Sequence, residues 1–344
     1  MNTTEKDRTG PAKPATATRQ TRRPAEPERF ALVGVWVVLI AVFCLLLPET
    51  FPTTANISNM LATQVVLLIL AVGLLYPLRA GDYDLSIAST LNLSTVVVAV
   101  LNAQQGWGIW PSVIVAILAA LAIGVLNGLI VTVFAINPFI VTLGMGTVVQ
   151  GLIYLLSDSA TISGIDRSLS DAVLTQPFLA IPVDFFYALA LCAVAWYVFD
   201  HTAFGQRLLF IGQSHDVARL NGVNVPRLRW RALIISAGSA GVAGVVYAGT
   251  TASADPVSGG SFLLPAFAAA FLGSTVLRIG RFNPWGTLIA VYFLVTGITG
   301  LQLLGAQQYV QELFYGGALI LAVIAAKLVR TRGERNRRAQ AAAA

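Results

Sequence analysis

The sequence predicts an all-α membrane protein with about ten transmembrane helices and both termini in the cytoplasm. Of its 344 residues, 56% are hydrophobic and only 11% are charged, and the mean hydropathy is +0.74. Soluble domains carry roughly 25% charged residues, so this composition excludes that class. Apolar windows also recur along the chain with the length of about 20 residues that a helix needs to cross the hydrocarbon layer.

These windows predict the following spans, with ends good to a few residues. In chain order they are Phe30–Leu47, Met60–Leu78, Ile87–Leu101, Pro111–Phe134, Phe139–Leu156, Pro182–Phe199, Ala232–Thr250, Leu264–Leu277, Trp285–Leu301 and Val310–Val329.

Positive charge falls in alternate gaps between the spans. The loop 200–231 contains five arginines, whereas the gap 157–180 contains only Arg167. Lys and Arg stay on the cytoplasmic side during insertion. An inside N-terminus and ten crossings place 21 of the 22 basic residues inside, all but Arg167. The net charge of +6 is therefore explained by orientation and contact with anionic membrane lipid, and it does not indicate nucleic-acid binding.

The chain divides into three parts. Residues 1–29 are rich in Pro, Thr, Ala and charge and are predicted to be a disordered cytoplasmic tail. A transmembrane permease domain covers 30–329 and includes the cytoplasmic loop 200–231, and residues 330–344 form a basic cytoplasmic tail. Cys44 and Cys192 lie in apolar spans and are expected to be unpaired core residues.

Several kinds of chemistry are excluded. The three lysines, at 6, 13 and 327, do not follow a glycine, so no phosphate-binding Gly-Lys loop is present. Two histidines are too few for a metal cluster, and no catalytic constellation falls at membrane depth. We therefore expect a transport protein that is not an enzyme and needs no metal or cofactor. Because ionisable residues in the spans are scarce, its energy source is expected to be another protein.

The loop 200–231 contains the signals of a helix of two turns or fewer. Ser214 is a suitable N-cap, Asp216 favours the positive helix end, and Asn221-Gly222 supplies a left-handed stop. Val217 and Leu220 lie three residues apart on one face, which suits docking into a groove of a partner. The alternative is an ordinary surface turn.

Three segments resemble the membrane subunits of ATP-binding cassette sugar importers, the ribose-type permeases. Gly81-Asp82-Tyr83-Asp84-Leu85-Ser86-Ile87-Ala88-Ser89 is similar to the family's Gly-Gly-Ile-Asp-Leu-Ser-Val-Gly-Ser, with Asp82 in place of a glycine. Asn127-Gly128 and the segment 137–144, which reads Asn-Pro-Phe-Ile-Val-Thr-Leu-Gly, match the second motif. Residues 202–225 resemble the family's cytoplasmic coupling segment.

The resemblance implies import of a monosaccharide or similar small polyol through the bacterial cytoplasmic membrane by alternating access. It also implies three partners: a separate cytoplasmic ATPase, an extracytoplasmic sugar-binding protein, and a second permease copy. The binding protein is expected at the gap 157–180 and at the turn Asp255-Pro256. The coupling residues implied by the third segment are Ser214, His215, Asp216, Ala218, Arg219, Leu220 and Gly222.

The candidate residues of a translocation path or gate are Asp84, Ser86, Asn92, Asn127 and Thr142. Asp84 and Ser86 either cap the helix that begins near Ile87, with Arg79 neutralising the acids, or lie on a broken segment near the path. The other three either offer hydrogen bonds to a sugar or join neighbouring helices.

Two alternatives to a sugar permease stay open. A branched-chain amino-acid permease would share the topology and the coupling logic, although the segment Asp84-Leu85-Ser86 fits the sugar type better. A standalone secondary carrier is the second alternative, and the scarcity of buried ionisable groups argues against it.

Overall fold

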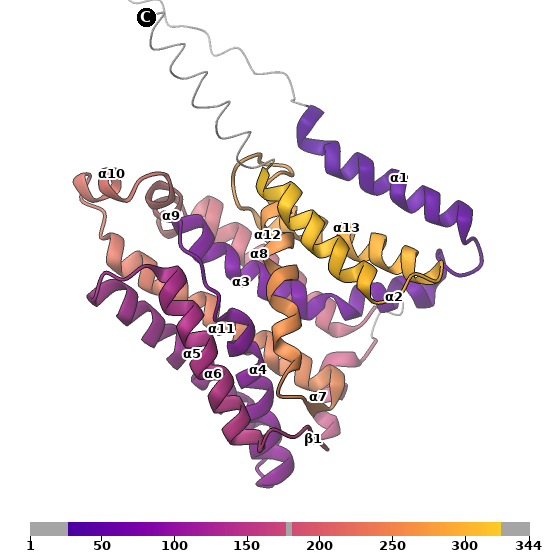
Figure 1. Cartoon of the computed structure of the whole chain (residues 1–344), viewed down its shortest axis with the longest axis horizontal. Coiled ribbons are helices and arrows are strands. Elements are labelled where there is room, and N and C mark those ends of the chain that lie inside the picture. The colour runs from indigo at the N-terminus through magenta and orange to yellow at the C-terminus, as the bar shows by residue number, and fades with distance from the viewer. Residues whose placement is uncertain (1–26, 177–180, 325–344) are drawn as a thin grey trace, which may run out of the picture.

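The computed structural model describes residues 27–176 and 181–324, and the fold is almost entirely helical (Figure 1). The elements in chain order are η1 Pro27–Phe30, α1 Ala31–Leu46, α2 Thr54–Thr63, α3 Val65–Ala80, α4 Ile87–Ala99, the π turn η2 Val100–Gln104, α5 Ile109–Val133, α6 Pro138–Ser157, β1 Ile162–Ser163, α7 Arg167–Leu174, α8 Val183–His201, α9 Ala203–Gln213, α10 His215–Leu220, α11 Val225–Thr251, β2 Ser253–Ala254, η3 Ser258–Phe262, α12 Leu263–Gly273 and α13 Pro284–Leu303. A further apolar helix follows at Tyr309–Ile324.

Every predicted span coincides with a helix. Within the described residues, seven helices are long and apolar enough to cross a membrane. In this count α2 and α3 together form one helix, and α4 and η2 together form another. Three shorter apolar helices, Ala31–Leu46, Ser258–Gly273 and Tyr309–Ile324, coincide with the remaining predictions. The all-α membrane fold is therefore confirmed, while the count of ten crossings stays a prediction.

The predicted tails lie mostly outside the described residues. The structure does not describe residues 1–26 and 325–344. The basic tail 330–344 and the end of the last predicted span therefore lie outside the described residues. Pro27–Phe30 form a short 3-10 turn, so the last residues of the predicted N-terminal tail take part in the fold.

The helices α3 and α11 form the centre of the bundle. All residues of α3 are buried, as expected for a helix that is apolar all round. The Ser-, Ala- and Gly-rich run 236–244 lies in α11 and lets neighbouring helices approach closely. The Ser94 hydroxyl of α4 donates to the Gly241 carbonyl at 2.8 Å, and the Thr95 hydroxyl donates to Gly244 at 3.0 Å. Both cysteines are free; Cys192 is buried, as predicted, whereas Cys44 is only half-buried and does not lie in the core.

The bundle has two distinct ends. Figure 1 shows α9 and α10 at the upper end and β1 and α7 at the opposite end. The Leu277 amide donates to the Arg29 carbonyl at 3.1 Å, and Arg278 forms an ion pair with Asp200 at the end of α8. These contacts gather the described basic segments at the end that carries α10. Arg167 begins α7 at the other end, so the structure is consistent with the predicted charge separation.

The opposite end joins the two segments that the sequence marked for a binding protein. β1 pairs antiparallel with β2, with Ile162 opposite Ala254 and Ser163 opposite Ser253. The Ile165 amide donates to the Ala252 carbonyl at 3.4 Å. The described part of the gap 157–180 and the turn at Asp255-Pro256 therefore form one continuous surface.

Candidate coupling loop and the α3–α4 junction

The predicted short helix is present as α10. The Ser214 hydroxyl accepts a hydrogen bond from the Val217 amide at 3.3 Å, as an N-cap should. At the other end Gly222 has a positive φ of 75°, and the Val223 amide donates to the Ala218 carbonyl at 3.1 Å. These bonds satisfy the helix ends and fix the direction in which the chain enters α11.

One face of α10 is apolar and unpartnered within the described chain. Leu220 is 87% exposed and Val217 is 47% exposed, whereas Ala218 is fully buried against the bundle. Asp216 and Arg219 are also exposed beside them. A six-residue helix is unstable alone, so Ala218 provides the tertiary support that it needs. The helix thus presents two apolar side chains flanked by charges.

His215 faces inward from α10. Its Nε2–H donates to the Ala80 carbonyl at the end of α3, with a distance of 3.0 Å. Just before α10, the α-carbon of Gly212 lies so close to the Arg79 carbonyl that a β-carbon at this position would overlap it. The candidate coupling loop therefore rests directly on the C-terminal end of α3.

The residues Gly81–Ser86, which we call the α3–α4 junction, connect α3 to α4 without regular structure. Asp82 in this junction is 2% exposed and forms a two-bond ion pair with Arg229 of α11. The Arg229 Nε and Nη2 atoms donate to Oδ2 and Oδ1 at 2.7 and 2.9 Å. Burial raises the pKa of Asp82, and the hydrogen-bonded guanidinium opposes that rise.

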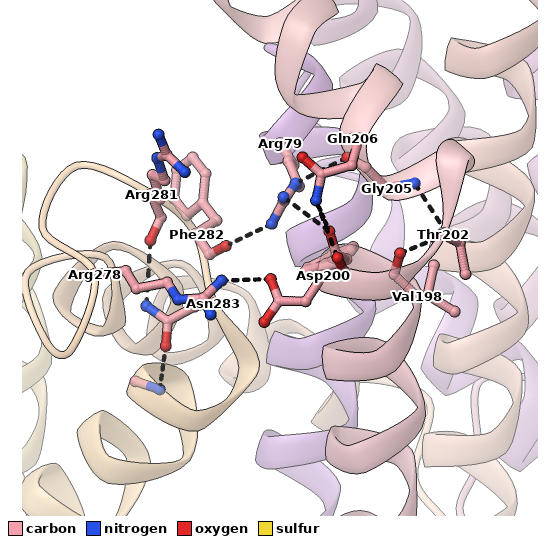
Figure 2. Close-up of polar contacts among 12 residues, drawn as sticks. Arg79, Val198, Asp200, Thr202, Gly205, Gln206, Arg278, Arg281, Phe282 and Asn283 are labelled. Atoms are coloured by element: carbon pink, nitrogen blue, oxygen red, sulfur yellow. Dashed lines mark hydrogen bonds and ion pairs between the residues drawn. The ribbon is translucent and has the colours of Figure 1, made fainter. Parts of the chain in front are cut away.

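The predicted role of Arg79 as the neutralising partner of these acids is wrong. Figure 2 shows that Arg79 instead reaches the turn between α8 and α9 and the segment before α13. It donates to three carbonyl groups, those of Phe199 and Gly205 at 3.2 Å and of Phe282 at 3.3 Å. Its guanidinium also lies 4.5 Å from the centre of the Phe199 ring. Arg79 therefore fastens the last turn of α3 to these segments.

Four of the five path candidates gather around the junction. Asp84 accepts hydrogen bonds from the Ser86 hydroxyl at 2.6 Å and from the Ser236 hydroxyl of α11 at 2.7 Å. The Asn127 amide of α5 donates to the Ser86 hydroxyl at 2.8 Å. Thr142 of α6 accepts from the Leu85 amide at 3.0 Å. The Asp84 carboxylate also accepts from the Ser86 amide at 3.1 Å. No side chain caps the start of α4 at Ser86, so the capping interpretation is not borne out.

Asn92 lies apart from this group. Its amide donates to the Pro256 carbonyl at 2.8 Å, and the Ser258 hydroxyl donates to its carbonyl oxygen at 3.3 Å. All five candidates are buried. The polar cavity beside the junction, of about 390 Å³, does not include them in its lining. Their participation in a translocation path stays a prediction.

The sequence did not identify Arg229 and Ser236 as partners of the two buried acids. A signal was present, since these two polar residues lie seven positions apart on one face of a mostly apolar helix. Two carboxylates within three residues also require nearby donors. Which donor on α11 binds which acid depends on how α11 packs across the junction, and that is a tertiary property.

Comparison with known proteins identifies the family. A family model described as "Branched-chain amino acid transport system / permease component" matches residues 56–323. The chain belongs to this permease family. Among curated relatives, the permease is 27% identical to the D-allose transport system permease protein AlsC of Escherichia coli, over 88% of this chain and 92% of that protein. It is 30% identical to the ribose import permease protein RbsC of Bacillus subtilis, over 85% and 90%.

A third relative is the L-arabinose ABC transporter permease protein AraH of Azospirillum brasilense, 29% identical over 86% of each chain. No solved structure matches the permease. These findings confirm the predicted resemblance to sugar ABC permeases and the location as a multi-pass protein of the bacterial cytoplasmic membrane. The relatives are transport permeases, which agrees with a transport subunit and not an enzyme.

Proposed function

We propose that this permease is the membrane-spanning subunit of an ATP-driven importer for a monosaccharide or a similar small polyol. The observation that carries the proposal is α10, whose exposed Leu220 and Val217 lie at the end of the bundle that collects the basic residues. An apolar pair that is exposed to the cytosol is suited to the groove of a partner protein. The names of the relatives, which refer to allose, ribose and arabinose, supply the class of substrate.

In this proposal the partner at α10 is a separate cytoplasmic ATPase. Nucleotide binding closes two ATPase subunits, and the closure displaces α10 of each of two permease copies. The displacement favours one of two packings of the helices, because the ATP-bound partner contacts α10 differently from the free one. An extracytoplasmic sugar-binding protein delivers its ligand at the opposite end, on the surface formed by β1, β2 and α7.

A branched-chain amino-acid permease is the second candidate function. The description of the matching family favours it, whereas the relatives named above favour sugars. Reconstitution with the cognate ATPase distinguishes the two. We expect ATP hydrolysis to be stimulated by binding proteins loaded with ribose, allose, arabinose or galactose, and stimulation only by a leucine-loaded binding protein would favour the second candidate.

The coupling assignment is tested by the double variant Arg219→Glu with Leu220→Asp. It reverses the exposed charge and removes the apolar contact, so we expect sugar uptake at background level and loss of co-purification with the ATPase. The matched control, Arg219→Lys with Leu220→Met, keeps both properties and should retain uptake. Membrane insertion of the two proteins is compared by their yield in washed membranes. Normal uptake by the first variant would refute the assignment.

A further inference from the structure

Three side chains from the coupling loop and α11 hold one short stretch of backbone at the end of α3. His215 binds the Ala80 carbonyl, Arg229 binds Asp82, and Ser236 binds Asp84. Arg229 and Ser236 are seven residues apart, which is about two helical turns, so they lie on the same face of α11. The second to fourth turns of α11 therefore run along the α3–α4 junction and contact it at alternate residues.

We propose that the Asp82–Arg229 ion pair is the positioning contact through which movement of the coupling loop reaches the α3–α4 junction. The inference rests on the proposed function, because it assigns a route to the displacement of α10. In this inference the partner of α10 stays the ATPase, and Asp82 and Arg229 act within the permease. They set the position of the junction relative to α11.

The pair is the strongest of the three contacts by geometry. A guanidinium that donates two bonds to one carboxylate fixes both distance and orientation, whereas each of the other contacts is one hydrogen bond. The Asp82 side chain is 2% exposed and the Arg229 side chain 17% exposed, so solvent screens the interaction only in part. The cavity of about 390 Å³ lies on one side of it, between the junction and the loop at Asn137 and Pro138.

The chain connectivity also directs movement through this pair. α10 ends at Leu220 and α11 begins at Val225, where the Asn224 side chain caps it by accepting from the Arg227 amide at 3.1 Å. A displacement of α10 therefore enters the first turn of α11. Arg229 lies one turn further, where it binds Asp82 in the junction between α3 and α4.

Beyond the pair, the junction is bonded to two further helices. The Ser86 hydroxyl, which donates to Asp84, accepts from Asn127 of α5. Thr142 of α6 accepts from the Leu85 amide. A shift of Asp82 therefore changes the positions of groups that hold α5 and α6 to the start of α4.

The test uses the full permease reconstituted with its ATPase and a sugar-loaded binding protein in vesicles. The variants are Asp82→Asn, Arg229→Gln and their combination, and both uptake and ATP hydrolysis are measured in the same vesicles. We expect co-purification with the ATPase to be retained and sugar uptake per ATP hydrolysed to fall about tenfold, a usual size for coupling between two sites. The double variant should be no worse than either single variant, because the two residues act as one unit.

Arg278→Gln is the matched control, because it breaks an exposed ion pair to Asp200 at the same end of the bundle and should leave uptake per ATP unchanged. Unfolding temperatures in detergent separate positioning from stability. A normal ratio of uptake to hydrolysis in Asp82→Asn would overturn the inference, and so would a ratio that falls only in step with the unfolding temperature. If Asp82→Asn does not assemble with the ATPase, uptake per ATP hydrolysed is measured for Arg229→Lys instead. This variant keeps the positive charge opposite Asp82 and loses the second hydrogen bond.

The two proposals fail separately. Uptake by the Arg219→Glu, Leu220→Asp variant refutes the coupling role of α10 and with it the proposed function. Normal coupling in the Asp82 and Arg229 variants refutes only the positioning pair.

Discussion

Asp84 is a carboxylate enclosed by central helices, and its position depends on a few donors. One oxygen accepts from the Ser86 amide and hydroxyl, and the other accepts from Ser236. A buried charged group is tolerated only when it is hydrogen-bonded. The sequence could identify Asp84 and Ser86 as unusual, because charges are scarce in this chain, but the donor on α11 is 152 residues away. Local sequence could therefore identify the acid and not its partner.

Ser236→Ala tests this arrangement at the scale of a single hydroxyl. It leaves one oxygen of Asp84 without a donor, and an unsatisfied buried group costs about 1–3 kcal/mol. We expect a corresponding loss of stability, measured by thermal or denaturant unfolding in detergent. Ser261→Ala is the control, because this exposed hydroxyl bonds only to the Ser258 carbonyl in the described structure, and the change should stay within about 0.5 kcal/mol. Equal stability of the two variants would contradict the role of Ser236.

At the scale of elements, the spans were predictable and the contacts at their ends were not. The length of an apolar stretch is a local property of the sequence, so each predicted span coincides with a helix. The caps of α10 are local as well, because Ser214 and Gly222 act within one or two turns. The carbonyl partners of Arg79 and the pairing of β1 with β2 join segments far apart in the chain. These required the packed bundle.

The contact between α9 and α3 gives a prediction at this scale. Gly212→Ala would place a methyl group against the Arg79 carbonyl, so either helix must shift, and overpacking of this kind costs about 1–3 kcal/mol. We expect lower stability in detergent and reduced uptake, because α10 follows directly. Gly144→Ala in α6 meets open space and serves as the control, with unchanged stability or a gain of up to about 1 kcal/mol. A neutral result at position 212 would show that α9 does not rest tightly on α3.

The described part of the molecule has two distinct ends. The basic end carries α10 and the contacts that join it to the centre, and the other end carries the surface formed by β1, β2 and α7 (Figure 1). The charge distribution predicted this separation from the sequence, because the rule for basic residues acts on the entire topology. It did not predict how α11 connects the ends through its small residues, since that depends on packing against α3, α4 and α5.

The central claim is that the permease contains no energy source and is driven through α10. It is tested most directly by accumulation of radiolabelled ribose, allose, arabinose or galactose in vesicles, with the permease alone and with the ATPase, ATP and loaded binding protein. We predict that the internal concentration of one of these sugars exceeds the external one only in the complete system. Accumulation against the gradient by the permease alone, without nucleotide, would contradict the account.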